Sequence, residues 1–395
     1  MLFDGTYARG AAAQAVTDAG WLRALLDVEA GLARAGAVTA IVPADAAERI
    51  AAACVPERFE LAALARDAGE HATVVVPLVR ALKEAVGAAD AGFVHAGATS
   101  QDVLDSAAML LARRALEPLL ADARAAAAAA ARLAAAHRDT PMTGRTLLQQ
   151  ALPTTFGLRA AGWTSALDAA RGDVAAVVTE RLAVQLGGPV GTGSPALTAA
   201  LARELGLVEP LLPWHTDRGR VVVLAAALGA LSGSCAKVAR DVTLLSQQEV
   251  GELREGGGAQ RGGSSAMAHK RNPVAAVSVL ACAARVPGLV ATLLAGMAQE
   301  HERAAGAWQA EWGTLSELLA LTGSAVAWAR DLLEGLEVDP ARMRDNLARL
   351  AAAGVAEAAD PAAHVGAAAE LVERVLSARG ASASAAASAA REVAR

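Results

Sequence analysis

Residues 262–274, GGSSAMAHKRNPV, gather polar groups in a chain that is otherwise rich in Ala, Leu, Val and Arg. Two serines, Ser264 and Ser265, follow a run of glycines, while Lys270 and Asn272 come just before a proline. Asn is a good helix N-cap and Pro suits the first helical turn, so this segment predicts a helix start. Since a helix N-terminus beside a cation binds anions, we expect the serines to meet a negatively charged ligand.

Three other polar segments, residues 93–107, 144–157 and 211–220, interrupt an otherwise helical pattern. Each falls at the end of a long helix that apolar spacing by three and four residues predicts. No sustained strand alternation appears. Because several helices of this length must bury long apolar faces, the sequence predicts an all-α bundle. We expect the long helices at about residues 105–137, 154–182, 217–252, 273–303 and 308–336.

Composition excludes several classes of protein. The 395 residues carry a net charge of −5, so there is no basic excess to neutralise nucleic-acid phosphates. The longest apolar run, residues 221–231, is too short to span a membrane, and charges near the N-terminus argue against a signal peptide. Three cysteines at unpatterned spacings indicate neither disulfides nor a zinc site. We therefore expect a cytoplasmic protein that binds neither membrane nor nucleic acid.

The glycine-rich segment resembles the signature loop of the fumarase/aspartase superfamily, usually written GSSxMPxKxNP. One position departs, because Ala268 stands where the superfamily has Pro. The resemblance covers about residues 1–340. It implies a fumarase/aspartase-like fold, with a long central helix bundle flanked by two smaller helical domains. The matching positions are Gly263, Ser264, Ser265, Met267, Lys270, Asn272 and Pro273.

The resemblance also implies roles for site residues. Ser264 is the expected catalytic residue, which exchanges a proton with a substrate carbon, and Ser265 supports the loop. Lys270 and Asn272 are expected to stabilise negative charge. The expected substrate-binding residues are Thr99, Ser100 and Gln101 in the first region, Thr146, Gln149 and Thr155 in the second, and His215 and Arg218 in the third.

Some of these residues also have plainer interpretations. His215 either bonds the substrate or caps a helix, and Arg218 either meets a substrate carboxylate or is an exposed helix arginine. We expect His95 to support the site from behind. Asp102 and Asp105 are expected at the first turn of a long helix, where acidic side chains are favourable, and not as acid or base groups.

Leu147 separates the possible reactions. Many superfamily members have a His directly after the Thr of GRT, where it acts as the general acid for the leaving group or orients one. Expelling hydroxide or an amine is slow without a positioned acid. A carboxylate has a conjugate acid with a pKa of about 4, so it can leave unprotonated. Leu147 therefore favours lactone chemistry, unless His95 or His215 supplies the acid.

The segments ATSQD, LPWHT and HERAAGAWQAEW are most similar to the cycloisomerase branch of the superfamily. That branch interconverts 3-carboxy-cis,cis-muconate and 4-carboxymuconolactone, in protocatechuate (β-ketoadipate) catabolism. The resemblance implies a tricarboxylate substrate, no cofactor, no metal, and a homotetramer whose active sites each take residues from three subunits. Adenylosuccinate lyase is the alternative enzyme. A non-catalytic helical scaffold is a third possibility, although the polar positions that it would lose are intact.

The sequence predicts three successive parts. Residues 1–104 form an N-terminal helical domain with the first substrate-binding region. Residues 105–340 form the central bundle with the signature loop at 254–274, and residues 341–395 form a short C-terminal helical segment.

Overall fold

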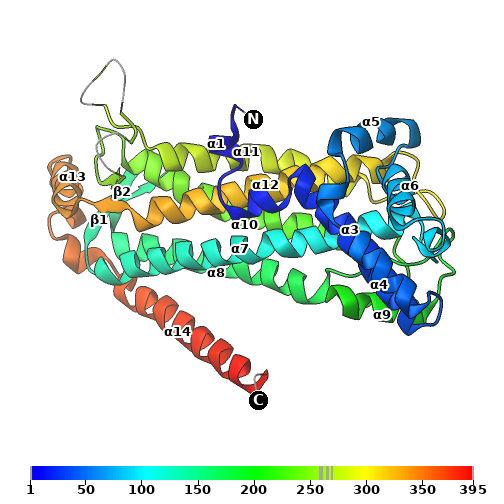
Figure 1. The fold of residues 1–395 in the computed structure, drawn as a ribbon. Coiled ribbons are helices and arrows are strands. Elements are labelled where there is room, and N and C mark those ends of the chain that lie inside the picture. The colour runs from blue at the N-terminus through cyan, green and yellow to red at the C-terminus, as the bar shows by residue number, and fades with distance from the viewer. Residues whose placement is uncertain (1, 258–260, 264–266, 268–269, 394–395) are drawn as a thin grey trace. The chain divides into compact units, whose positions relative to one another are not determined.

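The structure is a computed structural model that describes residues 2–257, 261–263, 267 and 270–393 (Figure 1). Helices dominate these residues, which confirms the all-α prediction. The α-helices are α1 (Asp4–Tyr7), α2 (Ala11–Ala15), α3 (Asp18–Val38), α4 (Ala44–Ala53), α5 (Leu61–His71), α6 (Val75–Val86), α7 (Ser100–Ala136), α8 (Phe156–Glu180), α9 (Pro195–Leu205), α10 (Gly219–Leu245), α11 (Val274–Ala295), α12 (Ala307–Glu334), α13 (Pro340–Ala352) and α14 (Ala368–Val393). Short 3-10 turns are η1 (Pro56–Arg58), η2 (Ala91–Phe93), η3 (Ala356–Ala358) and η4 (Pro361–His364).

All five predicted long helices are present as α7, α8, α10, α11 and α12. Two of them end earlier than predicted. Helix α10 ends at Leu245, before Gly251 with its positive φ of 64°, and α11 ends at Ala295, directly before Gly296. Because glycine is a poor helix former, the helix ends there although the apolar pattern continues.

Helix α7 begins five residues earlier than predicted. The Asp102 carboxylate accepts the backbone N–H of Thr99 at 2.9 Å, as the third residue of a capping box does. Asp102 thus lies in the first turn of α7, as expected for it. This cap fixes Thr99 and Ser100 at the positive end of a 37-residue helix.

The expectation of no strand is wrong for residues 141–155. Strands β1 (Pro141–Thr146) and β2 (Gln149–Thr155) pair antiparallel and make a hairpin. Its two-residue turn is Leu147–Leu148, whose φ angles are 50° and 65°. Turns of this kind usually contain Asn-Gly, which tolerates positive φ, so two leucines gave no hairpin signal. A second ribbon pairs β3 (Leu253–Glu255) with β4 (Leu336–Val338).

Contacts between residues group the chain into two compact units. Unit 1 comprises Met1–Leu120, Asp173–Ala230 and Ala284–Ser324, and unit 2 comprises Ala121–Gly172, Leu231–Ala283 and Ala325–Arg395. Each long helix contributes residues to both units. The three successive parts expected from the sequence divide the chain differently, along its length, and they remain a prediction.

Small side chains and buried hydrogen bonds bring elements together within each unit. In unit 1, a Cβ at Gly323 of α12 would lie 2.6 Å from the Ala12 side chain, so only glycine fits there. In unit 2, the Trp163 indole of α8 donates to Asp241 of α10 at 2.7 Å. These contacts hold the long helices laterally within each unit.

Helices α10 and α11 are long and apolar enough to cross a bilayer by length and composition alone. The sequence alone predicted no segment of sufficient length, because its longest apolar run is too short to span a membrane. The length and composition of the two helices are weak evidence for a membrane protein, because the core helix of a soluble protein passes the same test. Half of the most apolar window of α10 is buried in the structure, but only 33% of that of α11.

Candidate active site

The first predicted substrate region lies at the start of α7, in unit 1. Thr99 and Ser100 are half-buried at the N-terminal end of the helix. Ser100 also lines a cavity of about 750 Å³, together with Arg80, Lys83 and His95. A helix N-terminus and two cations beside one cavity suit a carboxylate ligand. Arg80 and Lys83 were not singled out in the sequence, where they look like ordinary surface residues of a helix.

His95 faces this cavity in a fixed orientation. Its Nδ1 lies 2.7 Å from the buried Glu29 carboxylate, and its φ is 65°. Burial alone would lower the pKa of His95, but the Glu29 carboxylate outweighs that effect, so the pKa is raised. The Glu29 carboxylate thus holds His95 in place beside the cavity, in line with the supporting role that we propose for it.

Gln101 is fully buried and its amide is fully engaged. The Nε2 group donates to Asp105 at 3.1 Å and to the His215 carbonyl at 2.8 Å. The Oε1 atom accepts from Arg303 at 2.9 Å. The side chain was expected to bind a substrate carboxylate, but it has 0% exposed surface. We therefore propose Gln101 as a positioning residue, which holds Arg303 beside the start of α7.

His215 is buried against Asp102. The two side chains are 5% and 1% exposed, and Nε2 of His215 lies 2.6 Å from the carboxylate. Asp102 also accepts the backbone N–H groups of Gly187 and Gly188, at 3.0 and 2.8 Å. The Nε2 atom of His215 is engaged by Asp102. We therefore propose that His215 supports the loop around it and does not bind substrate.

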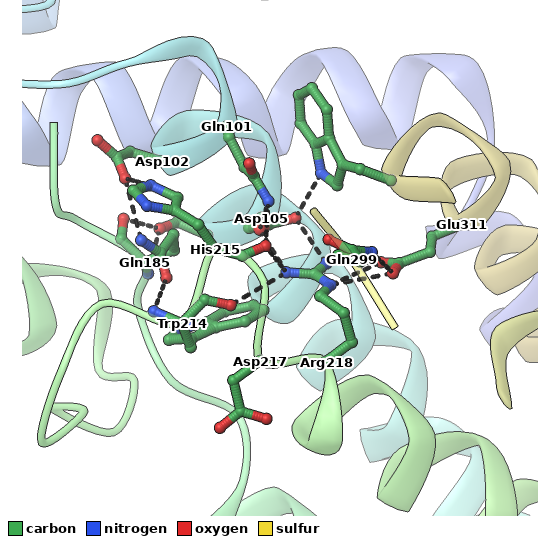
Figure 2. A network of polar contacts seen from close by, with 12 residues as sticks. Gln101, Asp102, Asp105, Gln185, Trp214, His215, Asp217, Arg218, Gln299 and Glu311 are labelled. Atoms are coloured by element: carbon green, nitrogen blue, oxygen red, sulfur yellow. Dashed lines mark hydrogen bonds and ion pairs between the residues drawn. The ribbon is translucent and has the colours of Figure 1, made fainter. Parts of the chain in front are cut away.

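Arg218 occupies the centre of a buried ionic network (Figure 2). Its guanidinium contacts Asp105 at 2.8 Å and Glu311 at 2.5 Å, and it is 2% exposed. The remaining N–H groups point at the carbonyls of Trp214 and His215. Arg218 was expected to meet a substrate carboxylate, but no donor is left for one. We therefore propose that Arg218 positions residues of the site and does not contact substrate.

The charges of this network are strongly coupled. Burial alone would lower the pKa of Arg218, but its two carboxylate partners reverse the effect and raise it. Burial raises the pKa of Glu311, and the negative charge of Asp105 adds to this effect, although Arg218 opposes it. The indole N–H of Trp308 donates a hydrogen bond to Asp105 at 3.0 Å, and the side-chain amide of Gln299 donates one to Glu311 at 3.1 Å. Arg218 thus remains charged although its side chain is buried.

The second predicted region is the tip of the β1–β2 hairpin, in unit 2. Thr146 and Gln149 are cross-strand partners on either side of the turn, and both are exposed. Leu147 between them is 96% exposed, so it is not a core residue. Thr155 is different: it is 1% exposed, and its hydroxyl accepts the Leu158 N–H at the start of α8. Thr155 caps a helix and lies away from the tip.

The hairpin is clamped near its tip by a buried carboxylate. Arg145 donates two hydrogen bonds to Glu252, at 2.9 and 2.7 Å, and Glu252 also accepts from Asn346 at 2.8 Å. The Glu252 side chain is completely buried. This bidentate pair fixes the strand one residue before Thr146.

The strained turn gives a testable prediction. A left-handed conformation costs roughly 1–2 kcal/mol for a residue with a Cβ, and Asn-Gly adopts it readily. The double variant Leu147→Asn/Leu148→Gly should therefore be more stable by about 1 kcal/mol in urea unfolding. If the tip contacts substrate, turnover should fall in the same variant. Equal or lower stability would mean that the leucines are not strained.

The signature segment is described in part. Ser264 and Ser265 lie outside the described residues. Lys270 is exposed and Asn272 is half-buried, directly before α11 begins at Val274. The predicted helix start is therefore confirmed to within one residue. Lys270 and Asn272 lie beside the positive end of a 22-residue helix.

The candidate residues fall into two groups. Thr99 and Ser100 belong to unit 1, with the cavity lined by cations. Thr146, Gln149, Lys270 and Asn272 belong to unit 2. Sequence reasoning missed the half-buried Arg303 and the buried Glu252, because a charged residue in a helical pattern looks solvated until its partner is known.

Comparison with known families identifies the class of protein. A lyase family matches residues 10–288. The chain belongs to this lyase family.

Individual relatives are more specific. The 3-carboxy-cis,cis-muconate cycloisomerase of Bradyrhizobium diazoefficiens is 48% identical over 342 residues, which cover 84% of this chain and 76% of the relative. The nitrosuccinate lyase of Streptomyces davaonensis is 46% identical, with 84% of this chain and 74% of the relative covered. Among solved structures, the 3-carboxy-cis,cis-muconate lactonizing enzyme from Pseudomonas putida superposes with a TM-score of 0.88 at 37% identity, covering 95% of this chain and 98% of that chain.

Proposed function

We propose that this protein is a cycloisomerase that interconverts 3-carboxy-cis,cis-muconate and 4-carboxymuconolactone. The observation that carries the proposal is Leu147, exposed at a hairpin tip between Thr146 and Gln149. An apolar side chain stands where a proton-donating group would serve other reactions of this family. The 48% identical cycloisomerase from Bradyrhizobium diazoefficiens supports the same assignment.

The missing acid fits the chemistry of a lactone. When the ring opens, the leaving group is a carboxylate, whose conjugate acid has a pKa of about 4. It needs no proton to depart, and in the reverse direction it attacks without losing one. A reaction that expels an amine or hydroxide would lose orders of magnitude in rate at such a site.

Lactonisation is an addition without any redox change. One carboxylate oxygen forms a C–O bond to an alkene carbon, and the displaced electron pair moves into the carboxyl group conjugated with it. The resulting aci-carboxylate carries two negative charges. A proton then reaches the carbon alpha to that carboxyl group, so the tricarboxylate plus one proton gives the lactone dicarboxylate. Stabilising the doubled charge is the largest demand on the protein.

Exposed and half-buried polar residues supply this stabilisation in the proposal. Lys270, Asn272 and the N-terminus of α11 face the aci-carboxylate, while Thr99 and Ser100 at the start of α7 hold another carboxylate. Ser264, which we propose from the sequence, exchanges the proton at carbon. Thr146 and Gln149 line the remaining side. No step of this reaction requires a metal or an organic cofactor.

The active sites are shared between subunits of a homotetramer in this proposal. Exposed apolar side chains on α11, Val277 at 53% and Leu294 at 54%, support an interface between copies. Leu147 and Leu148 at the hairpin tip are more exposed still, at 96% and 75%. Light scattering should give four times the chain mass of 39.7 kDa. We place the protein in the cytoplasm, in line with three buried free cysteines among the described residues.

A second candidate is the elimination of nitrite from a nitrosuccinate-like dicarboxylate. The 46% identical relative named nitrosuccinate lyase favours it, and Leu147 is compatible with it. Nitrite is a weak base, so it also departs without an acid. The two reactions therefore make the same demand at position 147.

A panel of three substrates distinguishes the candidates. Purified protein is incubated with 3-carboxy-cis,cis-muconate, nitrosuccinate or adenylosuccinate, and lactone, nitrite or fumarate is measured by NMR or colorimetry. We expect lactone from the first substrate, with kcat/KM at least tenfold above the others. Faster nitrite release would replace the proposal by the second candidate. Efficient adenylosuccinate cleavage would show that another residue serves as the acid.

A further inference from the structure

The chain on either side of the signature segment is joined by backbone contacts. The Asn272 N–H donates to the Gly262 carbonyl at 2.8 Å, and Gly263 forms an antiparallel bridge with Arg271. Gly262 has a φ of 70°, and a Cβ there would lie 2.2 Å from the Asn272 carbonyl oxygen. We call these paired residues, 262–263 and 271–272, the neck. It contains Asn272 and adjoins Lys270, two residues of the proposed site.

Arg261 anchors the chain directly before the neck. Its Nη2 atom lies 2.9 Å from the Glu255 carboxylate and 2.9 Å from the Asp331 carboxylate. The guanidinium also stacks over the Trp328 ring, 5.8 Å from its centroid. Only 22% of the Arg261 side chain is exposed. Two carboxylates on one guanidinium nitrogen and an aromatic ring under the guanidinium plane fix its orientation as well as its distance.

Glu255 connects this anchor to the other side of the neck. The same Oε1 atom that faces Arg261 accepts the Ala275 N–H at 2.6 Å, in the first turn of α11. The Glu255 side chain is 5% exposed, and burial raises its pKa. One buried carboxylate thus contacts the residue before the neck and the helix that follows it. Loss of either contact therefore changes how Arg261 and the start of α11 are placed relative to each other.

We propose that Arg261, held by Glu255 and Asp331, is a positioning residue that fixes the neck and thereby places Lys270 and Asn272 for the reaction. The inference rests on the proposed function of these two residues. Arg261 contacts no substrate itself. Its effect is geometric, because misplacing charge-stabilising groups by about 1 Å can cost up to 100-fold in rate.

A nearby ion pair provides a matched control. Arg254 pairs with Glu337 across the β3–β4 ribbon, one residue before Glu255, but its side chain is 73% exposed. Arg254→Gln therefore removes an arginine and an ion pair from the same ribbon without touching the neck. Exposed ion pairs of this kind contribute little to stability, so the control should fold and work normally.

The test compares Arg261→Gln, Arg261→Lys and Arg254→Gln in kinetics and in hydrogen exchange. We expect Arg261→Gln to lower kcat about 30-fold with KM changed less than threefold, and the Asn272 amide to exchange at least tenfold faster. Lysine keeps the positive charge but not the planar guanidinium. The kcat of Arg261→Lys should therefore fall between that of Arg261→Gln and that of the wild type. Glu255→Gln combined with Arg261→Gln should be no slower than Arg261→Gln alone, because both act through one contact.

The outcomes separate this inference from the proposed function. If Arg261→Gln matches Arg254→Gln in kcat and in amide exchange, Arg261 does not position the neck. A loss of kcat that only follows a loss of folded protein also overturns the inference. If the wild type lacks cycloisomerase activity, the proposed function fails, and unchanged Asn272 exchange in Arg261→Gln would additionally refute the anchor.

Discussion

Replacing Arg218 by methionine is expected to destabilise the protein by about 3–5 kcal/mol. The variant leaves the carboxylates of Asp105 and Glu311 facing each other, 3% and 6% exposed, without their cation. Two buried like charges must then be neutralised, hydrated or separated. Each of these outcomes lowers the free energy of unfolding by more than a typical single substitution does.

The measurement is urea unfolding of Arg218→Met beside Arg114→Met. Arg114 pairs with Asp27 at 2.6 Å, but its side chain is 40% exposed, so that variant should lose no more than about 1 kcal/mol. Adding Asp105→Asn and Glu311→Gln to Arg218→Met should recover part of the loss, because no buried charge remains. Equal stability of Arg218→Met and Arg114→Met would contradict the buried network.

Lys270→Met is expected to lower kcat by about 100- to 1000-fold, the usual cost of removing one donor that stabilises an oxyanion. The proposed intermediate carries doubled negative charge, and Lys270 is the cation placed beside the start of α11. Since Lys270 is exposed, the free energy of unfolding should change by less than about 0.5 kcal/mol. KM should change far less than kcat, because the charge develops only during the reaction.

Arg271→Met is the matched control for Lys270→Met. Arg271 is the neighbouring exposed cation, and its described contact with Gly263 is a backbone bridge, which methionine preserves. We expect its kcat to stay within about fivefold of the wild type. If Lys270→Met and Arg271→Met lower kcat equally, the rate depends on the total positive charge of this segment. The specific role of Lys270 would then be contradicted.

The sequence predicted the helical fold well because its signals are local. Apolar spacing located all five long helices, and Asn272 with Pro273 located the start of α11 to within one residue. The hairpin at residues 141–155 was missed, because its turn uses Leu147 and Leu148 instead of residues that favour positive φ. There, pairing between strands overrides local preference.

The candidate site was predictable as a set of segments but not as individual roles. Thr146, Gln149 and Lys270 are exposed, as ligand-binding residues should be. Gln101, His215 and Arg218 are buried against partners far away in the sequence, such as Glu311 and Arg303. A polar residue in a motif does not reveal whether its partner is substrate or protein, since that depends on tertiary contacts.

The most direct test of the account is the ultraviolet absorbance of freshly prepared 3-carboxy-cis,cis-muconate mixed with wild-type protein or with Ser264→Ala. Lactonisation destroys the conjugated diene, so absorbance should fall with the wild type and stay constant with the variant, provided both are folded. Decay at equal rates would contradict the role of Ser264. No decay with folded, tetrameric wild-type protein would contradict the cycloisomerase assignment itself.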